Sequence, residues 1–128
     1  MRATVSRFEI PARDPERVAR FYREVFGWEI EALPWDGPAY FRVRAAVADP
    51  GAEPREGIDG GVTEAAAGEP EHPLLVVHIA GATVEECLAR IVAAGGAVDL
   101  PAAAVGTMGR FARFRDPEGN RLGLWQAL

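Results

Sequence analysis

The feature that most constrains the fold of this chain is an internal repeat, in which one pattern of residues occurs twice within 128 residues. Each copy contains apolar residues at positions i, i+3, i+4, i+7 and i+8, the spacing that places them on one face of an α-helix. The first set is Val18, Phe21, Tyr22, Val25 and Phe26, and the second is Val84, Cys87, Leu88, Ile91 and Val92. Gly27 and Gly95 follow the two helices, and Pro34 and Pro101 come after them at matching distances. The sequence therefore predicts one structural module written twice.

Strand patterns surround each predicted helix. One strand precedes it and three follow, so each copy reads as a βαβββ module. Asp14 and Pro15 predict the start of the first helix, and Thr83 with Glu86 forms a capping box for the second. The expected strands are 5–10, 28–33, 39–46 and 57–63 in the first copy, and 74–80, 97–100, 111–115 and 121–125 in the second. The predicted class is α+β.

We expect a single domain over residues 1–128, with module one at about 3–64 and module two at about 74–127. A tract at about 49–73, rich in Pro and Gly, is interpreted as the flexible connector. Gly60 and Gly61 lie inside the strand expected there, and glycines in a strand favour an edge position or a bulge.

The C-terminal strands form a predicted hairpin around the turn sequence DPEGN at 116–120. Alternation assigns their side chains to two faces. One face is apolar and carries Ala112, Phe114, Leu122 and Leu124. The other is charged and aromatic, with Phe111, Arg113, Arg115, Arg121, Gly123 and Trp125. The second face either meets water or lines a ligand cavity.

Composition excludes several function classes. A net charge of −5 disfavours nucleic acid as a partner, because phosphate binding needs a positive surface. No apolar run is long enough for a membrane span and the first residues lack a signal-peptide pattern, so we expect a cytoplasmic protein with no membrane partner. All 14 basic residues are Arg, which removes lysine chemistry. Ser6 has no nucleophile-elbow glycines around it, and Cys87, the one cysteine, excludes internal disulfides.

Specific segments add a family resemblance. They are FEI at 8–10 before Asp14, FYREVFGW at 21–28, Gly95-Gly96, FARF at 111–114, DPEGN at 116–120 and LGLW at 122–125. With the twofold βαβββ repeat, they resemble the vicinal oxygen chelate superfamily of glyoxalase I, extradiol dioxygenases and bleomycin-resistance proteins. The resemblance implies a cup-shaped mixed sheet with helices outside, a divalent metal in the cup, and a homodimer.

The metal positions that the resemblance implies are where this sequence departs from the family. They fall on Arg7, Val76 and Gly123, with Gly60-Gly61 as the corresponding part of module one. None of these side chains offers the His or carboxylate ligands that zinc or iron requires, and the Arg would repel a cation. We therefore expect no metal and no other cofactor, with a divalent metal as the alternative.

Glu9 and His78 lie two residues beyond Arg7 and Val76, on the same strand faces. They are candidates for an acid/base pair or a shifted metal site. The alternative is that Glu9 neutralises Arg7, Arg42 or Arg113 while His78 is a structural histidine. His72 is expected to be exposed, and Cys87 to be a buried helix residue.

A set of aromatic and Arg residues interleaves with these candidates, and such a set suits a planar or anionic ligand, although each member could also be core. The expected ligand cavity comprises Arg7, Glu9, Trp28, Tyr40, Arg42, His78, Phe111, Arg113, Arg121 and Trp125. Three functions remain open at this point. They are a metal-free protein that binds a small organic molecule, a metal-dependent lyase or dioxygenase, and a scaffold or partner-binding module without a ligand.

Overall fold

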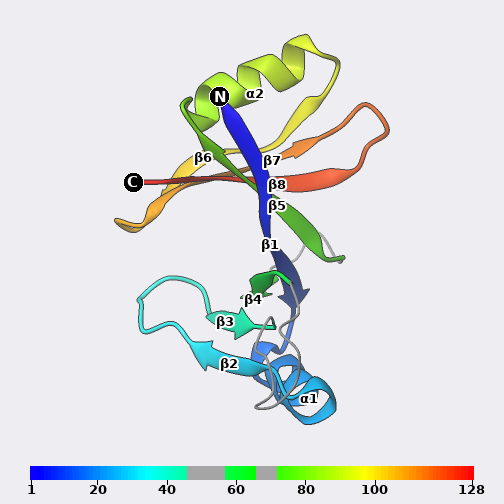
Figure 1. Cartoon of the computed structure of the whole chain (residues 1–128), viewed down its shortest axis with the longest axis vertical. Coiled ribbons are helices and arrows are strands. Elements are labelled where there is room, and N and C mark those ends of the chain that lie inside the picture. The colour runs from blue at the N-terminus through cyan, green and yellow to red at the C-terminus, as the bar shows by residue number, and fades with distance from the viewer. Residues whose placement is uncertain (46–56, 66–71) are drawn as a thin grey trace. The chain divides into compact units, whose positions relative to one another are not determined.

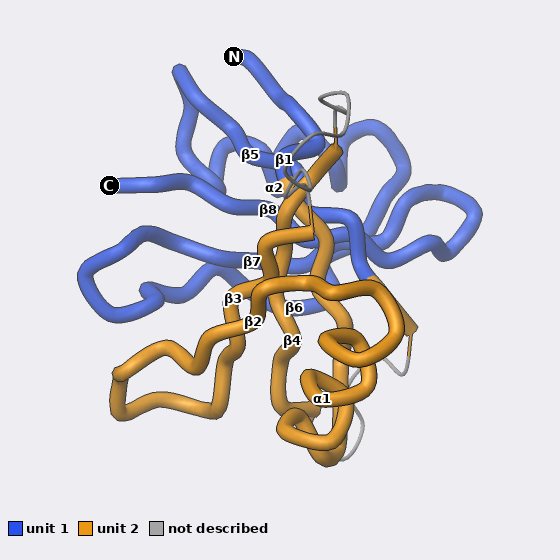
Figure 2. Tube along the Cα trace, turned by 60° about the horizontal axis from the view of Figure 1, so that its bottom comes forward, with its two compact units in different colours: residues 1–6, 74–128 blue, residues 7–73 orange. Residues whose placement is uncertain are grey.

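A computed structural model describes residues 1–45, 57–65 and 72–128. The chain divides into two compact units, shown in different colours in Figure 2. Unit 1 comprises Met1–Ser6 and Leu74–Leu128, and unit 2 comprises Arg7–Pro73. The second segment of unit 1 begins at Leu74, the residue at which module two was expected to begin. Most of the predicted connector, residues 49–56 and 66–71, lies outside the described residues.

Unit 2 contains one helix and four strands. They are β1 (Arg2–Ala12), which enters this unit at Arg7, α1 (Pro15–Phe26), β2 (Glu29–Ala32), β3 (Tyr40–Arg44) and β4 (Asp59–Glu64). The strand order is β2-β3-β4-β1. β4 is parallel to β1 and antiparallel to β3, which in turn is antiparallel to β2.

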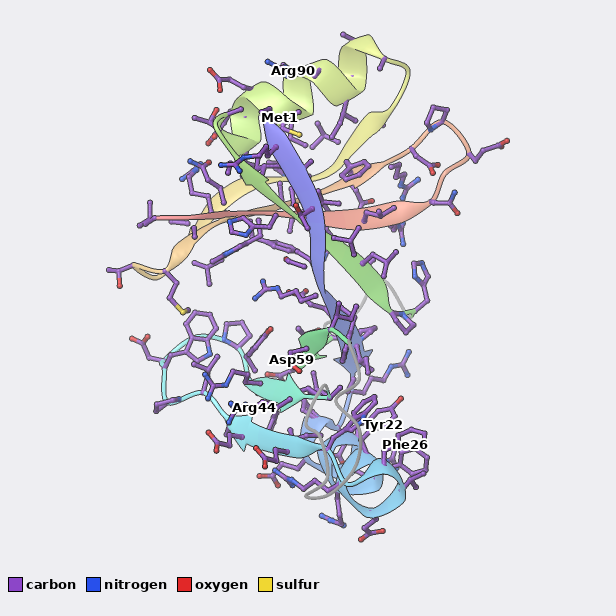
Figure 3. All side chains as sticks on the ribbon, in the orientation of Figure 1. Met1, Tyr22, Phe26, Arg44, Asp59 and Arg90 are labelled. Atoms are coloured by element: carbon purple, nitrogen blue, oxygen red, sulfur yellow. The ribbon has the colours of Figure 1, made fainter. Side chains whose placement is uncertain are left out.

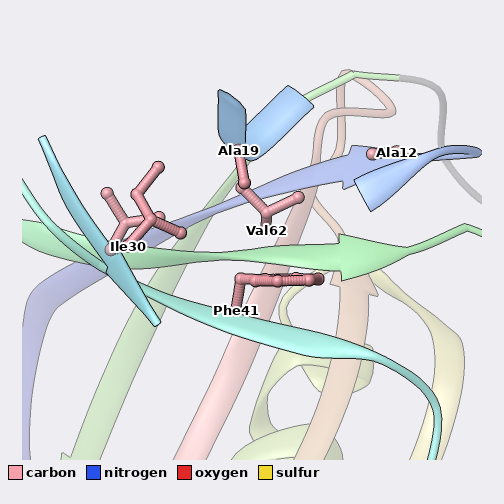
Figure 4. Close-up of a cluster of buried hydrophobic side chains, with 6 residues drawn as sticks. Ala12, Ala19, Ile30, Phe41 and Val62 are labelled. Carbon is pink, nitrogen blue, oxygen red and sulfur yellow. The ribbon is translucent and has the colours of Figure 1, made fainter. Parts of the chain in front are cut away.

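The local chemistry of α1 matches its predicted boundaries. The Asp14 carboxylate accepts a hydrogen bond from the Arg17 backbone N–H at 3.1 Å, and Pro15 fills the first turn where no N–H is needed. Gly27 ends the helix with φ of 69°, a conformation that glycine adopts without steric cost. The core beneath α1 consists of Ala12, Ala19, Ile30, Phe41, Val43 and Val62, most of which Figure 4 labels.

β4 lies between β1 and β3, so the expected edge or bulge at its glycines is wrong. The glycines instead make room for aromatic rings. A β-carbon at Gly60 would come within 2.6 Å of the Phe8 ring, and one at Gly61 would collide with the Tyr40 ring. Because successive strand residues face opposite sides, one ring covers β4 on each face.

Unit 1 contains the second helix and the other strands. They are β5 (Leu74–Ala80), α2 (Val84–Ala93), β6 (Ala97–Val105), β7 (Gly109–Arg115) and β8 (Arg121–Ala127). The strand order is β1-β5-β8-β7-β6, where β1 contributes its first residues. α2 packs on one face of these strands (Figure 1), over a core of Ile79, Val84, Cys87, Leu88, Ala112 and Leu124. The capping box of Thr83 and Glu86 is present.

β6 is longer than the predicted strand 97–100, because it continues through Pro101 to Val105. The predicted strand ended immediately before Pro101. β6 is the last strand in the order, where a proline costs no ladder bond on the outer side, and register shifts occur on either side of Leu100. The strand therefore accommodates Pro101.

The predicted α+β class is confirmed, with eight strands and two helices in the described ranges 1–45, 57–65 and 72–128. Neither of these helices has the length and apolar character needed to cross a membrane.

Candidate functional site

In each unit the helix covers one face of the strands, and the candidate residues project from the other face. In unit 2, Phe8, Phe41 and Val43 pack on the α1 side. Arg7, Glu9, Tyr40 and Arg42 alternate with them along β1 and β3, so they lie on the side away from α1. We call this side the module-one face.

Arg7, Glu9 and Tyr40 interact electrostatically on the module-one face. Arg7 Nη2 donates a hydrogen bond to Glu9 Oε1 at 3.2 Å, and Glu9 is a buried charged residue, 9% exposed. Glu9 is also the register partner of Gly61, the residue covered by the Tyr40 ring. Burial raises the pKa of Tyr40, Arg7 lowers it in part, and Glu9 raises it further. The ion pair is the interaction expected if Glu9 neutralises a neighbouring Arg.

Two predicted cavity residues of unit 2 have partners outside the group of Arg7, Glu9 and Tyr40. Arg42 forms an exposed ion pair with Glu31 on β2 at 3.7 Å. Trp28 precedes β2 and packs on the α1 side, with its ring stacked on Tyr22 at a centroid distance of 4.9 Å and near Phe8 at 5.9 Å. Tyr22 itself stacks on Phe26 along α1 (Figure 3). Trp28 therefore does not share the face of Arg7 and Glu9.

In unit 1, the predicted division of the C-terminal hairpin into two faces is confirmed by its register. Ala112 pairs with Leu124 and Phe114 with Leu122, and these residues are on the α2 side. Phe111 pairs with Trp125 and Arg113 with Gly123 on the opposite side. His78 on β5 is the register partner of Trp125. We call this helix-free side the module-two face.

The aromatic rings of the module-two face cover glycines. A β-carbon at Gly109 would lie 2.7 Å from the Trp125 ring, and one at Gly123 would lie 3.0 and 3.1 Å from two atoms of the Phe111 ring. The same β-carbon of Gly123 would lie 3.3 Å from Val76 Cγ2. Phe111 and Val76 therefore fill the space into which a side chain at position 123 would project.

The strand register identifies which residues of the two modules correspond. Val76 pairs with Gly123 in a parallel ladder, and Arg7 pairs with Asp59 in the equivalent ladder of unit 2. The module-one counterpart of Gly123 is therefore Asp59, at the start of β4 (Figure 3), and the expectation of Gly60-Gly61 was wrong.

Neither the two positions in unit 2 nor the two in unit 1 fit a divalent metal. Asp59 is one carboxylate, Arg7 is a cation, and Val76 and Gly123 carry no ligand atom. A metal site in a protein needs about three or more His, Cys or carboxylate ligands. Across the described ranges, no group of three such residues is placed to hold a metal ion. Glu9 belongs to unit 2 and His78 to unit 1, so their pairing stays a prediction.

Sequence reasoning missed Asp99, which organises the arginines of the module-two face. Its carboxylate is 9% exposed and accepts hydrogen bonds from Arg113 Nε and Arg115 Nε, both at 3.1 Å, while Arg121 Nε lies at 3.2 Å. Burial raises the pKa of Asp99, but the hydrogen bonds from Arg113 and Arg115 and the charge of Arg121 outweigh it, so the net pKa is lowered. The only sequence signal was an acidic residue in an otherwise apolar strand.

The remaining candidates are peripheral. His72 is exposed, as expected, and its ring lies 3.2 Å from the Pro73 carbonyl. Cys87 is a buried residue of α2, where burial raises the pKa of its thiol and Arg90 lowers it in part. Neither residue lies among the candidates of the two faces.

Comparison with known proteins assigns the family. The family model of the glyoxalase/bleomycin resistance protein/dioxygenase superfamily matches residues 4–124. The chain belongs to this superfamily. Its sequence is 29% identical over 119 residues to "Putative glyoxylase CFP32" of Mycobacterium tuberculosis. The match covers 93% of this chain but 44% of that protein, so the chain spans less than half the length of this relative.

Solved structures agree on the glyoxalase fold. Methylmalonyl-CoA epimerase of Streptomyces coelicolor, in complex with 2-nitronate-propionyl-CoA, aligns over 97% of this chain and 94% of its own, with TM-score 0.66 and 16% identity. A glyoxalase superfamily member from Vibrio splendidus aligns over 98% and 97%, with TM-score 0.57 and 13% identity. At these identities the likeness concerns the fold alone.

Proposed function

We propose that this glyoxalase-superfamily protein binds a small organic molecule on its helix-free faces without the divalent metal usual in the family. The observation that carries the proposal is the contact between the Phe111 ring and Gly123. Position 123 lacks a side chain and the space beside it holds an aromatic ring, so a metal-binding carboxylate has neither a source nor room there.

We propose ligand contacts for each face by itself, from its aromatic and charged side chains. Trp125 and Phe111 offer ring surface for a planar ligand, and Arg113 and Arg7 offer planar guanidinium groups. Tyr40 is protonated at neutral pH, as an ordinary tyrosine is, so its hydroxyl is a hydrogen-bond donor, and its raised pKa extends this to higher pH. Glu9 and His78 are the proposed acid/base residues if the protein catalyses a reaction.

A thermal-shift screen with small aromatic acids, aldehydes and CoA thioesters tests this proposal. The methylmalonyl-CoA epimerases of the same fold motivate the thioesters. Each compound is measured before and after dialysis against EDTA. We expect compounds that raise the melting temperature to do so equally in both samples. Loss of every shift after EDTA would overturn metal-free binding and favour the metal-dependent lyase or dioxygenase. Trp125→Ala should weaken the shift, whereas the exposed Arg44→Gln serves as the control.

We also propose that the protein is a cytoplasmic homodimer, as the family resemblance implies. Light scattering coupled to size-exclusion chromatography tests the assembly. A mass near 28 kDa, twice the 13.8 kDa chain, is the expected result, and a mass near that of one chain would contradict it.

A further inference from the structure

Arg115 and Arg121 form a like-charged pair at the end of the C-terminal hairpin next to its turn, residues 116–120. They are register partners on β7 and β8, and alternation places both on the module-two face. Like charges directly opposite each other on antiparallel strands destabilise the pairing. The arrangement therefore needs a counter-charge.

Asp99 on β6 supplies that counter-charge only in part. Its Oδ1 lies 3.1 Å from Arg115 Nε and 3.2 Å from Arg121 Nε. Its Oδ2 is committed to Arg113 at 3.1 Å. Within the described part of the chain, Asp99 is the one ion-pair partner of Arg115 and of Arg121. Asp99 thus supplies one negative charge to three guanidinium groups.

The geometry leaves the outer ends of both arginines available to a solute. Each contacts Asp99 through Nε, on the side edge of the guanidinium group, so the end-on edge, with one N–H from each Nη, faces another direction. The Arg115 side chain is 46% exposed and that of Arg121 is 27% exposed, whereas Asp99 is only 9% exposed. The carboxylate thus lies beneath two reachable guanidinium groups.

The adjacent turn carries negative charge, but its Asp116 forms no ion pair with Arg115 or Arg121 in the described ranges. Asp116 begins the turn, and its Oδ1 accepts hydrogen bonds from the backbone N–H groups of Glu118 and Asn120, both at 2.9 Å. Its Oδ2 accepts one from Asn120 Nδ2 at 2.8 Å. This carboxylate is held within its own turn.

We propose that Arg115 and Arg121, aligned by Asp99, form a binding site for the phosphate or carboxylate group of a small anion. Paired guanidinium groups match the oxygens of these anions through parallel, charge-assisted hydrogen bonds. Asp99 acts as a positioning residue that fixes the Nε edges of the two side chains. This inference deepens the proposed function, on which it rests, by naming the charged group of the ligand.

Titration calorimetry with inorganic phosphate, and separately with succinate, tests the site at constant ionic strength. The proteins are wild type, Arg115→Gln, Arg121→Gln and the control Arg44→Gln, which removes a 55% exposed strand arginine paired with Glu29. We expect saturable binding of at least one anion and about a tenfold or greater loss in each hairpin variant, the effect of losing a charged hydrogen bond. The control should retain wild-type affinity.

Two results would overturn the site: no saturable binding of either anion by wild type, or equal weakening in all three variants. If Arg115→Gln does not fold, Arg115→Lys replaces it, and retention of full affinity would contradict bidentate binding. Phosphate binding alone would assign the site to phosphate, and succinate binding alone to carboxylates. All proteins are dialysed against EDTA first. If neither anion binds but compounds of the thermal-shift screen still bind after EDTA, the anion site is overturned and metal-free ligand binding is not.

Discussion

The ring of Phe111 lies against Gly123, with ring atoms 3.0 and 3.1 Å from the point where a β-carbon would stand. Phe111 is the partner of Trp125, so its ring reaches diagonally across β8 to the position opposite Arg113. Aromatic residues that cover a neighbouring glycine compensate for the missing side chain. In this family member, packing thus occupies a position that the resemblance assigns to metal binding.

Gly123→Ala is expected to destabilise the protein by about 1–3 kcal/mol, because the added methyl group overpacks against Phe111 and Val76. Urea unfolding measures the change. In a Phe111→Ala background the same substitution should cost about 0.5–3 kcal/mol less, the coupling typical of residues in contact. Equal costs in the two backgrounds would show that the ring does not fill this space.

The phenol of Tyr40 should respond to its charged neighbours. Glu9→Gln is expected to lower the pKa of Tyr40, because Glu9 raises it, and Arg7→Gln is expected to raise that pKa further. Ultraviolet absorbance during alkaline titration measures the ionisation, and Tyr22→Phe in all samples leaves Tyr40 as the one tyrosine. An unchanged pKa in both variants would place the Arg7 and Glu9 charges too far from the hydroxyl.

Asp99→Asn should destabilise the fold by about 1–2 kcal/mol at neutral pH, because it leaves the Arg115 and Arg121 charges opposed and weakens charged hydrogen bonds. The pKa of Asp99 is lowered in the folded state, so its contribution is present above the unfolded pKa of about 3.9 and is lost as pH falls through the folded value. Urea unfolding of both proteins from neutral to acid pH checks this. A difference in stability that does not shrink toward acid would contradict it.

Cys87 should react slowly with thiol reagents in the native state. Burial raises the pKa of its thiol, so little of the reactive thiolate is present at neutral pH, and Cys87 packs into the core from α2. Colour release from Ellman's reagent measures the rate, with protein in denaturant as the reference for full reactivity. Equal rates in the native and denatured protein would show an open thiol.

Much of the fold could be predicted from the sequence, because apolar spacing, caps and turn residues agreed. Asp14 with Pro15 located α1, and the DPEGN turn located the last hairpin with its correct faces. Errors arose where one local signal had two physical explanations. Pro101 suggested a strand end but lies in an edge strand. Gly60 and Gly61 suggested an edge, but they lie in an interior strand and are covered by the rings of Phe8 and Tyr40.

The candidate site was less predictable, because contacts between strands distant in sequence decide it. Strand periodicity assigned Trp28 to the cavity, but this residue precedes β2 and packs on Tyr22. Asp99 was missed because a register shift lies between Val98 and Leu100, and only the paired strands bring it to its three arginines. The correspondence of Asp59 with Gly123 likewise required the observed ladders.

Elemental analysis by inductively coupled plasma mass spectrometry tests the central claim most directly. The protein is purified without chelator and then dialysed against zinc, iron, manganese and nickel salts before the unbound ions are removed. The account predicts far less than one metal ion per chain for every metal, with ligand binding unaffected. One tightly held ion per chain that is lost in a Glu9→Gln, His78→Ala variant would contradict it.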